Sequence, residues 1–206
     1  MKRLFTLILP AIKRAKVQII SIFIIYCISC SAGILMSHLG NQFALKTRDK
    51  IVNKAYNSDK ASIDYQKGEN LSAALLDFSG NLFLGAVPQT AMGLSIIIPY
   101  ITVPIQGWIG GIVSVDNNHL SRFKNIKSAL YFIIVILLQY IPYSLAIGSG
   151  IKLGVDCYTY NKSINSGFFN YKIKKESLID MGYVFIVVIP LFFIASLFEF
   201  LSSWNL

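Results

Sequence analysis

The sequence predicts an all-α fold, a polytopic transmembrane helix bundle of about five spans preceded by an interfacial helix. Thirty-eight consecutive residues, 78–115, carry no charged side chain, and 17–45, 128–151 and 181–198 are also free of charge. A hydrocarbon core about 30 Å thick takes roughly 20 helical residues, so the first interval is long enough for two spans. Hydrophobic residues make up 54% of the chain and charged residues 14%. The sequence therefore predicts a single membrane domain over 1–206.

The segment 1–16 combines an apolar stripe at helical spacing with basic residues around it. We expect a short helix that lies in the membrane interface, with Pro10 as an interruption. The alternative is a basic anchor that only orients the first span. The apolar run that follows is too long for the h-region of a signal peptide, so we interpret it as a retained span. The basic residues are Lys2, Arg3, Lys13, Arg14 and Lys16.

The expected spans are 17–39, 81–98, 101–115, 127–152 and 182–203, joined by polar loops at 40–77 and 156–180. Gly40 and Asn41 end the first span, and a weakly amphipathic helix is expected at 42–56. Pro99 and Pro104 divide the long uncharged interval. One span followed by a re-entrant hairpin is the alternative, because irregular backbone is tolerated at membrane depth where protein or water shields it.

The net charge of +9 is explained by basic residues that flank the spans. This distribution indicates membrane topology and contact with anionic lipids, not nucleic-acid binding. With five spans and the N-terminus inside, ten Lys/Arg lie in the cytoplasm and nine outside; with a re-entrant hairpin the numbers are eight and eleven. The basic cluster before the first span favours a multi-pass protein of the cell (inner or plasma) membrane with a cytoplasmic N-terminus.

Motifs for enzyme chemistry are absent from the sequence. His38 and His119 stand near span ends in no metal-binding or triad pattern, and no nucleotide-binding glycine loop or nucleophile elbow occurs. The three cysteines give no disulfide framework, and Cys27-x-x-Cys30 sits in an apolar helix, where two small side chains favour a packed contact. We therefore expect no enzyme, no cofactor and no metal.

Polar residues inside the spans are the candidate functional groups. Glu199 is the one acid in an expected span, where a charge costs roughly 2.5–3.5 kcal/mol at the membrane centre. It is either an interfacial residue near the end of its span or a buried partner of Gln139, Gln106 or Asn81. Gln106 and Gln139 are also expected to form hydrogen bonds between helices.

Small residues recur at a spacing of four, which places them on one helix face. This spacing lets helix backbones approach closely in a membrane. Packing among the spans of one chain is favoured over a self-association surface that would make a homo-oligomer. The residues are Gly107 and Gly111 in one span, and Ala146, Gly150 and Gly154 in another.

The order of these positions resembles the stage II sporulation protein M family of membrane proteins, over roughly 73–203. The series runs through Asn81, Gly93, Gln106-Gly107-Trp-Ile-Gly110, Gly150-Ile-Lys-Leu-Gly154 and Phe193-Ile-Ala-Ser-Leu-Phe-Glu199. The Asn-Gly pair usual in the family's middle span appears here as Gln106-Gly107. The family's Pro-His-Gly with a following glutamate is missing from the fourth span, and Gln139 stands at the place of that glutamate, counting back from Gly150.

The resemblance implies a non-enzymatic bacterial membrane protein that acts with partners. One expectation is a scaffold or recruiter of membrane and envelope proteins in cell-envelope remodelling. The alternative is the permease-like subunit of an ABC-type exporter, transporting with a separate cytoplasmic ATPase. In that case 161–176 is the candidate docking loop for the ATPase.

Overall fold

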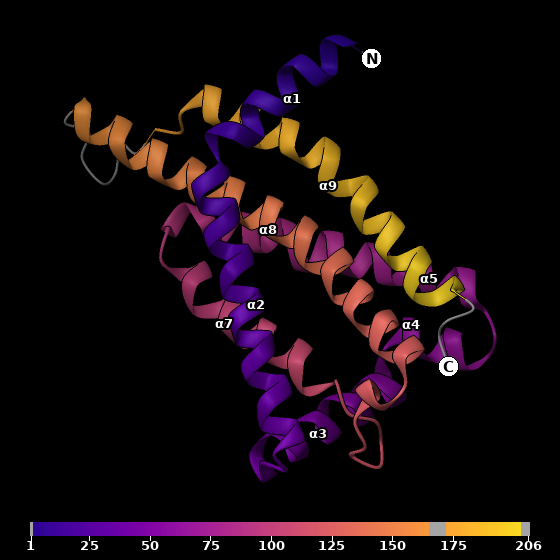
Figure 1. The fold of residues 1–206 in the computed structure, drawn as a ribbon. Coiled ribbons are helices and arrows are strands. Elements are labelled where there is room, and N and C mark those ends of the chain that lie inside the picture. Colours follow the sequence, from indigo (N-terminus) through magenta and orange to yellow (C-terminus); the bar gives the residue numbers. More distant parts are fainter. Residues whose placement is uncertain (1, 165–171, 203–206) are drawn as a thin grey trace.

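The computed structural model describes residues 2–164 and 172–202, and it confirms the all-α fold: no strand occurs in this part of the chain (Figure 1). The α-helices are α1 (Lys2–Arg14), α2 (Lys16–His38), α3 (Gln42–Ser58), α4 (Lys60–Gln66), α5 (Asn70–Ser79), α6 (Val87–Met92), α7 (Ile98–Ile112), α8 (Ile126–Ser163) and α9 (Lys175–Leu201). Between them lie a π-helix, η1 (Gly80–Ala86), and two 3₁₀ turns, η2 (Gly93–Ser95) and η3 (Arg122–Lys124).

Among the described residues, four helical segments are long and apolar enough to cross a membrane: Lys16–His38, Asn70–Ser95, Ile126–Ser163 and Lys175–Leu201. The protein is therefore a membrane protein. The helix α7 has 15 residues, which corresponds to a length of about 22 Å at 1.5 Å per residue. It is shorter than the hydrocarbon core, so length alone does not make it a span.

The direction of α7 follows from its contacts with α2, along which it packs (Figure 1). Near the start of both helices the hydroxyls of Ser21 and Tyr100 are 3.0 Å apart, and near their ends Ser37 Oγ donates to the carbonyl of Ile112. The two helices are therefore parallel. We call the end of the bundle that holds the start of α2 the N-terminal end, and the opposite end the distal end.

The second long segment differs from the prediction at both of its ends. It begins at Asn70, not at 81, because the charge of Asp77 lies inside the helical segment and does not mark its boundary. The break that follows is not at the prolines. It lies at Ile96, which has φ +63°, an unusual conformation for a β-branched residue. Pro99 is in the first turn of α7, where a missing N–H is harmless.

The expected polar loops are partly helical. The loop 40–77 contains α3, α4 and the start of α5, and α8 continues to Ser163, well beyond 152. The helix α1 also continues through Pro10. Residues 165–171, which belong to the expected loop 156–180 and to the candidate docking loop, lie outside the described residues.

Two buried apolar clusters form the core. One joins α2, α7 and α8 around Ile22, Tyr26 and Val103. The other joins α1, η1, α8 and α9 around Ala11 and Phe192. The side chains of α1 thus pack against the start of α9, and Arg14 forms a bidentate ion pair with Asp180 there, which raises the pKa of Arg14.

Candidate functional site: a polar cavity within the helix bundle

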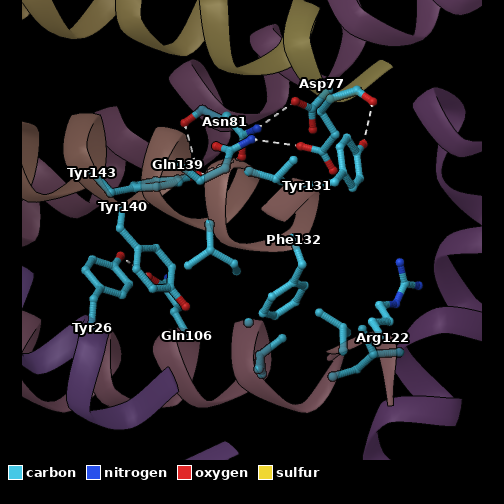
Figure 2. A pocket seen from close by; sticks show the side chains of 17 residues that line it. Tyr26, Asp77, Asn81, Gln106, Arg122, Tyr131, Phe132, Gln139, Tyr140 and Tyr143 are labelled. Carbon is cyan, nitrogen blue, oxygen red and sulfur yellow. Dashed lines mark hydrogen bonds between the residues drawn. The ribbon is translucent and has the colours of Figure 1, made fainter. Parts of the chain in front are cut away.

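A cavity of about 710 Å³ lies between α2, α5, η1, α7, α8 and α9 (Figure 2). It reaches from Tyr26, in the middle of α2, to Ile51 and Arg122 at the distal end. A large apolar cavity with a few convergent polar groups is the usual form of a small-molecule site. Two carboxyl groups, three side-chain amides and four tyrosines line it: Asp77, Glu199, Asn81, Gln106, Gln139, Tyr26, Tyr131, Tyr140 and Tyr143.

Asp77 connects α5, η1 and α9. Its Oδ2 atom accepts hydrogen bonds from Asn81 Nδ2 at 2.9 Å and from Ser196 Oγ at 2.6 Å. Asn81 lies one helical turn further on, where the backbone has widened to a π-helix, a feature frequent at functional sites. The carboxyl group of Asp77 is therefore held in place by two donors within the membrane segment.

Glu199 contacts α8 from the end of α9. Gln139 Nε2 donates a hydrogen bond to its Oε2 atom at 3.1 Å, and Tyr131 donates to its backbone carbonyl at 2.7 Å. Of the three partners that the sequence suggested for Glu199, the structure places Gln139 in contact. Asn81 bonds Asp77 instead, and Gln106 accepts a hydrogen bond from Tyr26 at 2.7 Å.

Four tyrosine rings surround the amides, and each of their hydroxyls donates to the protein. Beside the bonds of Tyr26 and Tyr131, Tyr140 donates to the carbonyl of Gly107 at 3.1 Å and Tyr143 to Asn81 Oδ1 at 2.9 Å. The rings of Tyr26 and Tyr140 stack with their centres 4.5 Å apart. These bonds hold the rings in the cavity wall.

Arg122 is the one basic residue in the cavity wall within the described residues. Figure 2 shows its side chain at a different end of the cavity from Asp77. Arg122 belongs to η3, outside the spans, and desolvation by the surrounding protein atoms lowers its pKa. The positive charge therefore lies at the distal mouth, and the carboxyl groups lie along the wall.

A second cavity of about 700 Å³ lies at the distal end between α4, α5 and η1. Its wall includes Asp59, Lys60 and Leu84, and it shares Asp77 and Asn81 with the first cavity. The hydrogen-bonded pair of Asp77 and Asn81 thus stands between the two cavities.

The small residues of the sequence prediction lie at close contacts between helices of this chain. A Cβ atom on Gly107 would be 2.8 Å from the carbonyl oxygen of Tyr26 in α2. A Cβ atom on Gly111 would be closer still to the backbone of Cys30, and one on Gly150 to that of Thr90 in α6. Gly154 lies against Gly93 and Leu94, and Ala146 is fully buried. These faces are occupied within the monomer.

The helix α8 thus has two parts, which we name by their residues. The cavity segment, 131–143, carries the bulky side chains of the cavity wall. The packed segment, 146–154, carries the small residues, and six consecutive positions from Ala146 to Ile151 are buried on all sides. Ser196, Tyr131 and Tyr143 belong to the site but were not predicted. Their only sequence signal is polarity within an apolar run.

Residues associated with redox and metal chemistry lie outside the cavity. Cys27, Cys30 and Cys157 are free thiols, and His38 bonds Ser121 at the distal end. No group of three His, Cys, Asp or Glu side chains that could hold a metal ion occurs in the described residues.

Comparisons of the chain with protein-family models, with curated proteins and with solved structures find no match.

Proposed function

We propose that this protein is the permease-like membrane subunit of a transport complex, and that the polar cavity is its solute site. The observation that carries the proposal is a pair of carboxyl groups, Asp77 and Glu199, in the wall of one cavity inside a membrane helix bundle. Ionisable groups at membrane depth are costly and characteristically line pathways for ions or substrates.

The helices around the cavity also support transport. The second long segment changes from α-helix to π-helix at Gly80, next to Asn81 in the cavity wall, and π-helical turns are frequent at functional sites. The cavity reaches the distal end of the bundle, whereas the packed segment of α8 closes the N-terminal end. This arrangement corresponds to one state of an alternating-access cycle. The energy would come from a separate ATPase.

The second candidate function is the scaffold or recruiter that the family resemblance implies. The layer formed by α3 and α4 favours it, because this layer lies at the distal end, outside the bundle, and carries exposed charges of both signs. Arg48, whose side chain is 4% exposed, ties the layer to the loop before α8 by donating to Asn117 Oδ1 at 2.8 Å. A polar layer of this kind is suited to docking an envelope protein. The exposed charged residues include Lys46, Lys50, Lys54, Asp59 and Lys60.

Co-purification from native membranes in a mild detergent, combined with complementation of a deletion strain, separates the two functions. The variant to compare with wild type carries Asp77→Asn and Glu199→Gln, which keep the side-chain shapes. A permease should bring a stoichiometric ATP-binding protein with both forms, while only wild type complements. An envelope protein or cell-wall enzyme as the partner, with full complementation by the variant, would contradict the permease and support the scaffold.

A further inference from the structure

The cavity wall offers hydrogen-bond acceptors in excess. Asp77 Oδ2 already has two donors, but Asp77 forms no ion pair with any described residue. Gln139 turns its amide nitrogen to Glu199, and its Oε1 atom is buried without a hydrogen-bond partner in the described part of the chain. A buried acceptor without a donor is unfavourable, so this part of the wall is suited to a ligand that brings N–H groups.

The rings in the wall are suited to the same ligand for a second reason. The hydroxyl hydrogens of Tyr26, Tyr131, Tyr140 and Tyr143 are all engaged in bonds to the protein. The tyrosines therefore offer the cavity their ring surfaces and oxygen lone pairs, not donors. Aromatic faces attract cations and also pack against apolar groups.

We infer that the cavity binds an organic cation, an ammonium or amidinium group on an apolar body, with the charge at Asp77 and Glu199. This inference rests on the proposed function, because it names the solute class of the same cavity. An organic anion would meet two carboxyl groups, and Arg122 lies at a different end of the cavity from Asp77 (Figure 2). The volume of about 710 Å³ is within the range for drug-sized ligands, far more than a single inorganic ion fills.

Binding of matched probes to the purified full-length protein in a non-ionic detergent tests the inference. The cations are tryptamine and benzamidine, and their neutral counterparts of similar shape are tryptophol and benzamide. Indole-3-acetate serves as the anion. Calorimetric titration should show that at least one cation binds roughly 10- to 100-fold more tightly than its neutral counterpart, the range expected for a charge-assisted hydrogen bond. The anion should not bind.

Two carboxamide variants locate the site. Asp77→Asn and Glu199→Gln should each weaken binding of the cation roughly 10-fold or more. The control Glu69→Gln, which removes an exposed carboxyl group at the start of α5, should leave binding unchanged. If one carboxamide variant does not fold, Gln139→Leu provides the second test, because it removes the buried acceptor without changing a charge.

Three outcomes would overturn the inference. They are equal binding of cation and neutral counterpart, unchanged cation binding in the carboxamide variants, and no binding of either cation. None of them bears on whether an ATPase co-purifies, so failure of the inference and failure of the proposed function are distinguishable.

Discussion

The two parts of α8 differ in how they pack: one lines a cavity inside the membrane bundle, and the other lies in close contact with its neighbouring helices. In the cavity segment, large side chains such as Tyr131, Gln139 and Tyr143 hold the neighbouring helices apart and enclose about 710 Å³. In the packed segment, Gly148 and Gly150 let α2 and α6 approach to backbone contact. Large side chains dominate the cavity segment and small ones the packed segment, so the difference comes from side-chain size and from the placement of polar groups. In this protein, the order of large and small side chains along α8 determines where the cavity lies.

The largest expected effect is on the packed segment. In Gly150→Leu the new Cβ would collide with the backbone of Thr90, and neither backbone can move without separating α6 from α8. We expect a destabilisation of about 3 kcal/mol or more, at the upper end for overpacking, with loss of monodisperse protein in detergent. Folded yield by size-exclusion chromatography measures it.

The control for this prediction is Gly182→Leu in α9, where a Cβ would have no atom within 4 Å. It should give wild-type yield. If Gly150→Leu behaved like this control, close packing at the N-terminal end would be refuted.

An intermediate effect is expected at the wall of the cavity. Glu199→Ala removes the acceptor that Gln139 Nε2 bonds at 3.1 Å, and an amide left without its partner costs about 1–3 kcal/mol. It should also abolish function or assembly. Glu199→Gln should be milder, because it retains an oxygen acceptor. Thermal unfolding of the three proteins measures the difference, and identical wild-type behaviour of both variants would show that Glu199 is merely interfacial.

The smallest effect is expected in the layer formed by α3 and α4, which we call the distal layer, where it contacts the loop before α8. His119 Nε2 lies 3.0 Å from the carboxylate of Asp49 and, as the hydrogen-bond donor, lowers the pKa of Asp49. Because the pKa is lower in the folded state, this contribution is complete above the ordinary pKa of about 3.9 and is lost as the pH falls through the lowered value. Asp49 is partly exposed, so the contribution is below about 1 kcal/mol.

The variant His119→Asn tests this, because asparagine tolerates the positive φ of residue 119. The melting temperature should fall slightly at pH 7, and the decrease of stability below pH 4 should become less steep. An effect as large as that of Gly150→Leu would show that the distal layer is integral to the bundle.

The sequence predicted the fold class and the close-packing positions, because uncharged runs and small residues at a spacing of four are local patterns. It could not place the start of the second long segment. Asp77 was taken as a boundary, and its contacts with Asn81 and with Ser196, 119 positions away, explain a carboxyl group inside a helical segment. The cavity could not be predicted either, because its wall combines residues from α2, α3, α5, η1, α7, η3, α8 and α9. Gln139 was one of three candidate partners of Glu199, and only the fold shows which of the three is in contact.

The most direct test of a solute cavity beside a closed segment is labelling with a membrane-impermeant cationic thiol reagent. The three native cysteines are first replaced by serine. Val135→Cys, in the cavity wall, and Ser149→Cys, in the packed segment, are then compared in membranes in which the reagent reaches the distal side. We expect rapid labelling of the Val135→Cys variant and none of the Ser149→Cys variant. Equal labelling of the two variants, or labelling of neither, would contradict a water-accessible cavity closed at its N-terminal end.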